Sequence, residues 1–250
     1  MDHAGIVFEH VRKQYPDGTV AVGDLSLTVM PGEILCLVGP SGCGKSTTLR
    51  MVNRLVEPTS GTITVGGADV LAQQAVQLRR SIGYVIQHVG LFPHRTVEQN
   101  VATVPGLLGW DKARTRARVR ELLDLVGLPH ARYGGRYPHE LSGGERQRVG
   151  VARALATEPP VMLMDEPFGA VDPQRRRNLQ QEFRSLQRDL GTTVMMVTHD
   201  IREAVILADR IAVFSEGGVL EQLGTPDQVT SEPANAFVED FLADFGALSD

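Results

Sequence analysis

The chain has 250 residues, 42% apolar and 22% charged, and a formal net charge of -5. No apolar run reaches the roughly 18 residues of a membrane-spanning helix and the first ten residues show no secretory signal, so we expect one cytoplasmic domain that does not cross a membrane by itself. The acidic charge argues against a nucleic-acid partner.

Two cysteines, Cys36 and Cys43, are separated by six residues. That spacing fits no zinc site, and two thiols make no disulfide framework. We expect both to be reduced.

The predicted elements alternate between strands and helices. Residues 6–11 and 20–29 resemble strands with no helix between them, which indicates an antiparallel β-layer. Residues 33–38 suit a strand buried on both faces of a mostly parallel sheet, and residues 45–55 predict the helix after it. Later apolar runs alternate with helices and indicate an α/β fold, at residues 161–164, 193–197 and 210–214.

Strand signals are absent between residues 89 and 157, which predicts an inserted helical subdomain. Asp111 can cap a helix there, and Gly127 followed by Pro129 ends it. The helix has apolar positions at helical spacing, namely Val119, Leu122, Leu123 and Val126. Its basic run, residues 112–120, predicts a solvated face; a surface for nucleic acid or anionic lipid is the alternative.

A phosphate-binding pattern, G-x-x-x-x-G-K-[ST], lies between a predicted strand and a predicted helix. Such a loop turns backbone N–H groups toward one point, where the helix N-terminus adds positive potential. Lys45 would contact the β- and γ-phosphates and Ser46 would bind Mg²⁺. The predicted nucleotide contacts are Gly39, Pro40, Ser41, Gly42, Cys43, Gly44, Lys45, Ser46 and Thr47.

Two carboxylates follow the run at 161–164. Asp165 and Glu166 would lie at the carboxyl end of a strand, where open α/β sheets bind ligands. We expect Asp165 to hold Mg²⁺, directly or through water, and Glu166 to orient or deprotonate the attacking water of a phosphoryl transfer. The alternative is a surface turn before Pro167.

His199 follows the run at 193–197 and precedes a helix N-cap at Asp200. We expect it at the same sheet edge as Asp165. A histidine there is structural or contacts the γ-phosphate, and its position favours the contact.

The segment Leu141-Ser-Gly-Gly-Glu145 opens a predicted helix. Ser142 and Glu145 fit an S-x-x-E capping box, which is an ordinary structural interpretation. However, two glycines weaken a first helical turn by about 1 kcal/mol each relative to alanine, which makes sense where bare backbone must approach an anion. We interpret the segment as a second phosphate contact.

In this order, the segments resemble the ATP-binding subunit of an ABC transporter over almost all 250 residues. The match also includes Tyr15, Gln87 and Asp172. The resemblance implies an α/β fold with a RecA-like P-loop NTPase core, the antiparallel β-layer and the helical subdomain. It implies a single ABC ATPase domain, with its core in residues 1–88 and 158–232, its helical subdomain in 89–157 and a helical tail in 233–250.

The resemblance also implies roles for further residues. Tyr15 would stack on adenine, although a strand-end tyrosine covering the β-layer is the alternative. Gln87 would sense Mg²⁺ and the attacking water, and would join Lys45, Glu166 and His199 as a catalytic group.

A head-to-tail homodimer with two ATP molecules between its subunits is implied as well. Contacts to the γ-phosphate held by the other subunit would come from Ser142, Gly143 and Gly144, and Asp172 would cross the interface. The segment Gly169-Ala-Val-Asp172 departs from the common family pattern, which has serine first and leucine third, but it retains Asp172.

Within that family the chain looks most like the importers of osmoprotectants, which carry glycine betaine, carnitine, choline or proline. The similarity lies in residues 82–94, 96–101, 104–110 and 233–241. The implied function is ATP hydrolysis, at the cytoplasmic face of the inner membrane, that drives uptake through a separate membrane permease. An extracytoplasmic solute-binding protein is an indirect partner. Many such subunits continue into paired regulatory domains; the sequence ends at Asp250, so regulation by such a pair is not implied.

Three other functions remain as alternatives. One is an importer ATPase for another small solute, such as an amino acid. Another is an ABC-type ATPase acting on DNA or ribosomes, which usually needs a long coiled-coil insertion or a second ATPase unit. The third, a P-loop kinase, conflicts with the segment from Leu141 to Glu145.

Two apolar features have open interpretations. Leu91, Phe92 and Pro93 resemble the groove that receives a short cytoplasmic helix of a membrane subunit; alternatively, Leu91 and Phe92 are local core. A helical stripe near the end packs on this subunit or meets a partner, and consists of Phe237, Val238, Phe241, Leu242 and Phe245.

Overall fold

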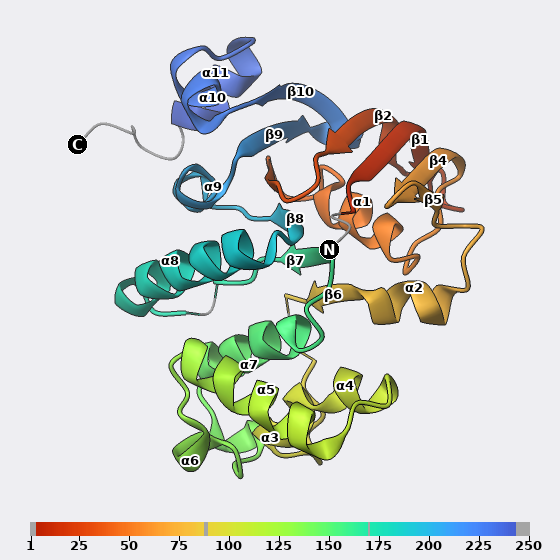
Figure 1. The fold of residues 1–250 in the computed structure, drawn as a ribbon. Helices are drawn as coiled ribbons and strands as arrows, with labels where there is room; N and C mark the ends of the chain where they lie inside the picture. Colours follow the sequence, from red (N-terminus) through yellow and green to blue (C-terminus); the bar gives the residue numbers. More distant parts are fainter. Residues whose placement is uncertain (1–3, 88–89, 170, 244–250) are drawn as a thin grey trace.

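The computed structural model describes residues 4–87, 90–169 and 171–243. It contains two sheets and a group of helices beyond the edge of the larger one (Figure 1). The smaller sheet is antiparallel, with the order β2-β1-β4-β5. Its strands are β1 (Ile6–Gln14), β2 (Val20–Val29), β4 (Ser60–Val65) and β5 (Ala68–Asp69).

The larger sheet has the order β10-β9-β3-β8-β7-β6 and is parallel except for β10. Its strands are β3 (Ile34–Val38), β6 (Ile82–Val85), β7 (Val161–Asp165), β8 (Thr193–Val197), β9 (Arg210–Ser215) and β10 (Val219–Gly224). The predicted α/β architecture with an antiparallel layer is therefore confirmed. The strands β4, β5, β6 and β10 were not predicted.

The core helices are α1 (Lys45–Val52), α2 (Ala75–Ser81), α8 (Pro173–Leu190), α9 (Ile201–Leu207), α10 (Pro226–Ser231) and α11 (Ala236–Ala243). Between β6 and β7 the described residues form only helices and turns, as predicted for the helical subdomain. Its helices are α3 (Val97–Val101), α4 (Thr103–Leu107), α5 (Lys112–Leu125), α6 (His130–Tyr133) and α7 (Gly143–Leu155), with a 3₁₀ turn at Pro138–Glu140. A second 3₁₀ turn, Glu216–Gly218, joins β9 to β10.

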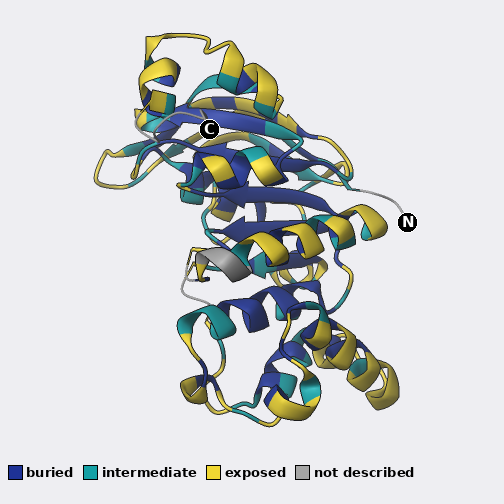
Figure 2. Ribbon diagram, turned by 90° about the vertical axis from the view of Figure 1, so that its left-hand side faces the viewer, coloured by how far each residue is buried: buried dark blue, intermediate teal, exposed yellow. Residues whose placement is uncertain are grey.

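The parallel strands are buried on both faces, as Figure 2 shows. In β3, Ile34, Cys36 and Val38 belong to a cluster shared with α5, α7, α8 and α9, whereas Leu35 and Leu37 belong to a cluster shared with α1 and the antiparallel sheet. Both cysteines are buried and free. This two-sided burial explains the continuous apolar runs in the sequence.

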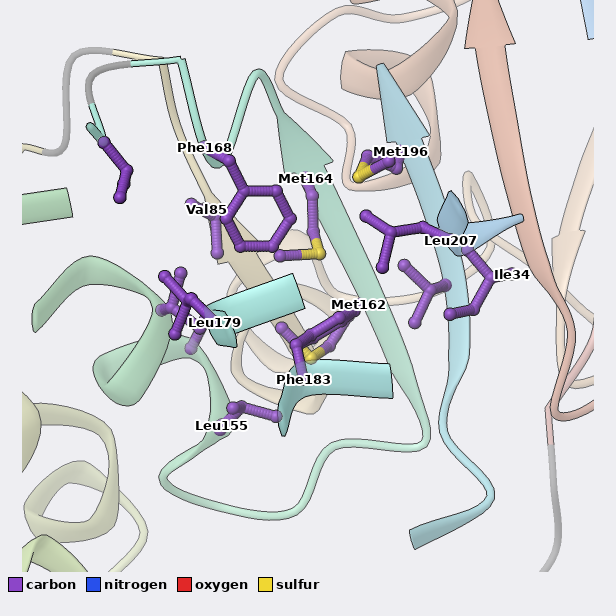
Figure 3. Packing of buried hydrophobic residues seen from close by; sticks show 14 of the residues in the cluster. Ile34, Val85, Leu155, Met162, Met164, Phe168, Leu179, Phe183, Met196 and Leu207 are labelled. Atoms are coloured by element: carbon purple, nitrogen blue, oxygen red, sulfur yellow. The ribbon is translucent and has the colours of Figure 1, made fainter. Parts of the chain in front are cut away.

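The face covered by α8 contains the aromatic packing drawn in Figure 3. The rings of Phe168, after β7, and Phe183, on α8, lie edge to face with their centroids 6.1 Å apart. They lie beside the β7 methionines Met162 and Met164. The turn that follows Asp165 and Glu166 is thus anchored in the core.

The predicted helix at 45–55 is wrong at its end, because α1 stops at Val52. Arg54 has a left-handed backbone with φ 55°. The N–H groups of Leu55 and Val56 both donate to the carbonyl of Arg50. These bonds close a turn where the prediction continued the helix.

Helix α5 was predicted correctly, with Asp111 as its cap: the Asp111 carboxylate accepts from the Arg114 N–H at 2.9 Å. Most of its basic run is exposed, as expected for a solvated face. Arg118 is the exception. It is buried, pairs with Glu121 at 2.6 Å and donates to the Leu155 carbonyl at 3.2 Å, so it attaches α5 to α7.

The C-terminal stripe packs on this subunit over the residues described. Val238 and Phe241 are buried, and Phe237 and Leu242 pack against the same core. Phe245 lies outside the described residues.

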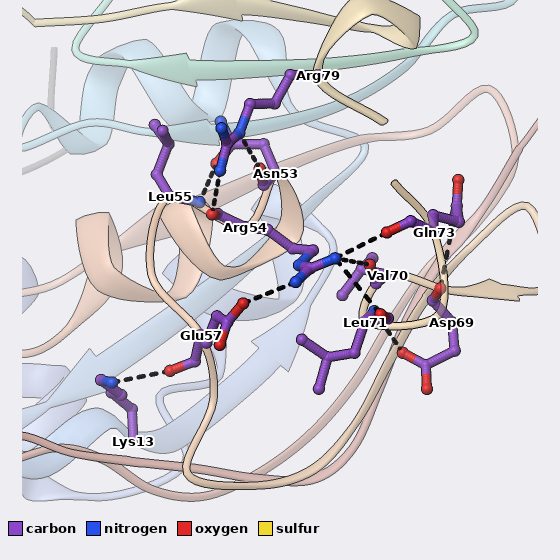
Figure 4. Close-up of polar contacts among 10 residues, drawn as sticks. All are labelled: Lys13, Asn53, Arg54, Leu55, Glu57, Asp69, Val70, Leu71, Gln73 and Arg79. Atoms are coloured by element: carbon purple, nitrogen blue, oxygen red, sulfur yellow. Dashed lines mark hydrogen bonds and ion pairs between the residues drawn. The ribbon is translucent and has the colours of Figure 1, made fainter. Parts of the chain in front are cut away.

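The end of α1 is attached to the segment between β5 and α2, and to α2 itself, by the contacts in Figure 4. The Arg54 guanidinium donates to the Gln73 carbonyl at 2.7 Å, more weakly to the Val70 and Leu71 carbonyls, and to the Glu57 carboxylate at 2.7 Å. Arg79 donates to the carbonyls that end α1, including that of Arg54 at 2.6 Å. Two arginines therefore hold the helix that follows the phosphate-binding pattern.

Arg54→Ala should lower the free energy of unfolding by about 1–3 kcal/mol, because the carbonyls that it satisfies are left unpaired. Chemical denaturation monitored by circular dichroism measures this. Arg120→Ala, at an exposed position on α5, is the control and should change stability by less than about 0.5 kcal/mol. Equal effects of the two substitutions would contradict the assigned role of Arg54.

Candidate functional site

Three loops meet at one edge of the larger sheet. The strands β3, β8 and β7 are adjacent and parallel, so their carboxyl ends lie together. The glycine-rich loop follows β3, Glu166 follows β7 and His199 follows β8. The predicted common edge is confirmed in this geometry.

The loop after β3 depends on glycine at two positions. Gly39 has φ 144° and Gly44 φ 96°. A Cβ would lie 2.2 Å from the Phe214 carbonyl oxygen at Gly39 and 2.1 Å from that of Ala21 at Gly44. No side chain caps the N-terminus of α1. Its first N–H groups are therefore available to an anion.

The Lys45 side chain extends back to the start of the same loop. Its buried ammonium donates to the carbonyls of Gly39 and Pro40, each at 2.7 Å, and lies 3.4 Å from the Cys43 sulfur. A positive charge is thus held within the turn of the loop, in reach of an anion bound by the loop N–H groups.

A cavity of about 350 Å³ opens over this loop, a size suited to a small ligand. Tyr15 lines it, with its hydroxyl 3.3 Å from Thr47 Oγ1. The other lining residues are Thr19, Val20, Ala21, Ser41, Gly42, Cys43, Gly44, Lys45, Ser46, Thr47, Glu166, Val197 and His199. The segment 19–21 was missed, because nothing in it but its nearness to Tyr15 could have indicated a site.

Ser46, which lines the cavity, forms an oxygen pair with Asp165. Ser46 Oγ donates to Asp165 Oδ1 at 3.0 Å, and Arg50 Nη2 lies 3.4 Å from Asp165 Oδ2. Hydroxyl and carboxylate oxygens suit Mg²⁺, which keeps water and phosphate ligands instead of a full protein cage. The described residues contain no group of three or more His, Cys, Asp or Glu that could hold a metal.

The Glu166 carboxylate lies at the centre of a second group. Gln87 Nε2 donates to Glu166 Oε2 at 2.9 Å, and His199 Nδ1 lies 3.4 Å from the same oxygen. Three predicted catalytic residues from three loops are therefore in contact. Lys45 and Glu166 line one cavity with His199.

Buried polar side chains anchor the loop that carries His199. The Thr198 hydroxyl donates to Glu203 Oε2 at 2.5 Å and accepts from the Asp200 N–H at 3.1 Å, while Gln180 donates to Glu203 Oε1 at 2.9 Å. Burial raises the pKa of Glu203. The anchoring residues Thr198, Gln180 and Glu203 are buried, whereas the His199 side chain is 65% exposed.

The segment at the start of α7 forms the capping box. Ser142 Oγ accepts from the Glu145 N–H at 3.3 Å, and the Glu145 carboxylate accepts from the Ser142 N–H at 2.8 Å. The Ser142 N–H lowers the pKa of Glu145, and the Tyr133 hydroxyl, at 2.9 Å, acts in the same direction. The box uses two of the four N-terminal donors and leaves the N–H groups of Gly143 and Gly144 for an anion. Capping and anion binding are therefore compatible.

Not all predicted site residues come together within one chain. The cavity over Lys45 is not lined by the residues at the start of α7, namely Ser142, Gly143 and Gly144. It is not lined by the exposed Asp172 either. In the groove segment, Leu91 packs against the core whereas Phe92 is 39% exposed, so the local-core alternative holds for Leu91 alone.

Two further residues contact the site and were not predicted. Arg50 reaches Asp165, and Gln147 Nε2 donates to the Glu166 carbonyl oxygen at 2.6 Å. Both lie inside helices, where neither residue type carries a local signal for such a contact.

Comparison with known proteins agrees with this geometry. Residues 22–169 match the family model described as ABC transporter. The chain belongs to the ABC transporter family. Its ABC fold is shared with the solved dimeric structure of MJ0796, a bacterial ABC transporter cassette, at a TM-score of 0.81 and 32% identity over 88% of this chain and 98% of that one.

ABC proteins of known name are similar over most of the chain. The carnitine transport ATP-binding protein OpuCA of Listeria monocytogenes is 53% identical over 94% of this chain and 59% of its own length. The glycine betaine/carnitine/choline transport ATP-binding protein OpuCA of Bacillus subtilis is 54% identical over 94% and 61%. The glycine betaine uptake system ATP-binding protein YehX of Escherichia coli is 50% identical over 95% and 76%. The chain thus spans about three-fifths of the length of the first two relatives. Among the described residues, every helix is too short or too polar to span a membrane.

Gly44→Ala should lower the free energy of unfolding by at least about 3 kcal/mol, because a strained φ and a 2.1 Å contact with backbone combine there. Gly42→Ala is the matched control. Gly42 also has a positive φ, 85°, but its added Cβ meets nothing within 4 Å, so the expected loss is about 1–2 kcal/mol. Urea denaturation distinguishes them. Equal losses would show that the close approach to Ala21 is unimportant.

Proposed function

We propose that the chain is the ATP-hydrolysing subunit of an importer and that it energises uptake of an osmoprotectant through a separate membrane permease. The observation that carries this proposal is that the Glu166 carboxylate contacts Gln87 and His199 beside a phosphate loop. This is the small set of positioning and charged groups that phosphoryl transfer to water requires.

Each group has a role in the proposed reaction. The phosphate-loop N–H groups and Lys45 bind the phosphates of ATP, and Tyr15 stacks on its adenine ring. Ser46 and Asp165, with Gln87, would hold Mg²⁺, which when bound neutralises developing phosphate charge. Glu166 accepts a proton from the attacking water, and His199 contacts the γ-phosphate.

The proposed active form is a head-to-tail homodimer. Gly143 and Gly144 expose N–H groups outside their own cavity, which supports a role on ATP held by the other subunit. Ser142 and Asp172 belong to the same interface. The MJ0796 cassette, which has this fold, was solved as a dimer.

The proposed cargo is glycine betaine, carnitine, choline or proline. It rests on the names of the similar ATP-binding proteins, since no residue of this subunit is expected to touch the solute. We place the subunit on the cytoplasmic face of the membrane, attached to permease subunits through the segment at Leu91 and Phe92. An extracytoplasmic solute-binding protein would deliver the cargo.

Glu166→Gln should abolish ATP hydrolysis, leave ATP binding intact and trap a dimer, because the amide keeps the geometry but cannot accept the proton. Size-exclusion chromatography with and without ATP, beside a hydrolysis assay, measures this. Ser142→Arg should also abolish hydrolysis with little change in ATP affinity, but without a dimer. If Glu166→Gln stayed monomeric with ATP and hydrolysed ATP at the wild-type rate, both the role of Glu166 as catalytic base and the proposed dimer would be contradicted.

Deletion of the gene from its host should abolish uptake of one radiolabelled osmoprotectant, because the permease would lose its energy source. The wild-type gene should restore uptake, and a gene carrying Glu166→Gln should not. Uptake of an unrelated amino acid is the control. If only that control transport were lost, the proposed cargo would be wrong although the ATPase assignment would stand.

A further inference from the structure

We propose that Gln147 is a positioning residue that ties helix α7 to the backbone of Glu166, so that the start of α7 and the catalytic carboxylate move as one unit. The proposal rests on the proposed function, because it assumes that Glu166 acts on water and that the start of α7 meets a phosphate. It adds a physical link between the two.

The contact is direct and interior. Gln147 is 1% exposed, and its Nε2 donates to the Glu166 carbonyl oxygen at 2.6 Å. A buried amide is costly unless its polar atoms are bonded, so Gln147 is held to this partner instead of turning to solvent. Gln147 lies five positions after Ser142, which is about 7.5 Å along a helix axis.

The backbone that Gln147 binds is strained. Glu166 has φ 49°, the left-handed region that non-glycine residues enter at a cost of about 1 kcal/mol or more. Its two peptide groups are fixed: the N–H donates to the Val197 carbonyl at 2.9 Å, and the carbonyl accepts from Gln147 and, at 3.3 Å, from the Gly169 N–H. In this conformation the carboxylate meets Gln87 and His199. Removing the amide donor releases the shortest of these restraints.

The same helix has another side-chain contact to backbone, at Gly90. Arg153, six positions after Gln147, donates from Nη1 to the Gly90 carbonyl at 2.8 Å. Burial lowers the pKa of this guanidinium. Helix α7 is thus bound at the backbone carbonyls of Glu166 and Gly90.

A consequence follows for the proposed dimer. The N-terminus of α7 would bind the γ-phosphate of the ATP held by the other subunit. Gln147 on the same helix would position Glu166, the catalytic base that acts on the ATP of its own subunit. Phosphate binding at the start of α7 would therefore change the position of Glu166, because only about one and a half turns of helix separate the two contacts. The coupling requires the amide donor of Gln147.

The test compares steady-state ATP hydrolysis by wild type and Gln147→Met in the full chain. Methionine has a similar length and volume but no N–H donor. We expect kcat to fall about 10- to 100-fold, because a small misplacement of a catalytic group has effects of that size. The affinity for a fluorescent ATP analogue, measured on the same samples, should change less than twofold. Gln77→Met, at an exposed position of α2, is the control and should match wild type in kcat and affinity.

A second variant tests the donor itself. In Gln147→Glu the introduced carboxyl, whose pKa burial raises, can donate an O–H to the Glu166 carbonyl only while protonated. The ratio of its kcat to that of wild type should therefore fall as pH rises. Gln147→Met should show a constant ratio. This pH signature separates positioning from loss of packing, and it decides the matter if Gln147→Met does not fold.

Two results would overturn the role of Gln147 while leaving the proposed function intact. One is kcat within twofold of wild type for Gln147→Met when Glu166→Gln is inactive. The other is a pH-independent ratio for Gln147→Glu. If wild type itself does not hydrolyse ATP, the proposed function fails first, so the two failures are distinguishable.

Discussion

Burial of the parallel strands on both faces is the constraint on which the site depends. Because residues along β3 alternate between two hydrophobic clusters, a shift of register by one residue would send Leu35 and Leu37 to the wrong side. The register places the ends of β3, β8 and β7 side by side. Lys45, Glu166 and His199, more than 30 residues apart in every pair, line one cavity as a result.

The sequence predicted best what local chemistry determines. Helix α5 depends on its Asp111 cap and apolar period and was predicted correctly. The predicted phosphate loop has the positive-φ glycines beside one lysine that its pattern requires. Tertiary contacts decided the rest. Helix α1 ends early where Arg54 turns toward the carbonyls of Gln73 and its neighbours. Gln147 could not be predicted, since a helical glutamine usually faces solvent and its partner is a backbone oxygen 19 residues away.

The capping segment shows why structural and functional interpretations of a motif need not compete. The side chains of Ser142 and Glu145 satisfy one backbone donor each, and these lie at the two ends of the first turn. The donors between them belong to Gly143 and Gly144, where no Cβ obstructs approach. The Glu145 carboxylate is held from both sides, because its second oxygen accepts from the Tyr133 hydroxyl.

The division of contacts between the two parts of the chain explains why the helical subdomain cannot be a passive insertion. Groups that line the nucleotide cavity come from the two sheets and their loops, whereas the unused N–H groups of Gly143 and Gly144 come from α7. If both parts serve ATP, the chemistry needs a connection that survives motion between them. The buried apolar side chains of α7 pack in one cluster with residues of the core strands and supply part of this connection. The Gln147 amide adds a direct link, because it donates from the same helix to the Glu166 carbonyl.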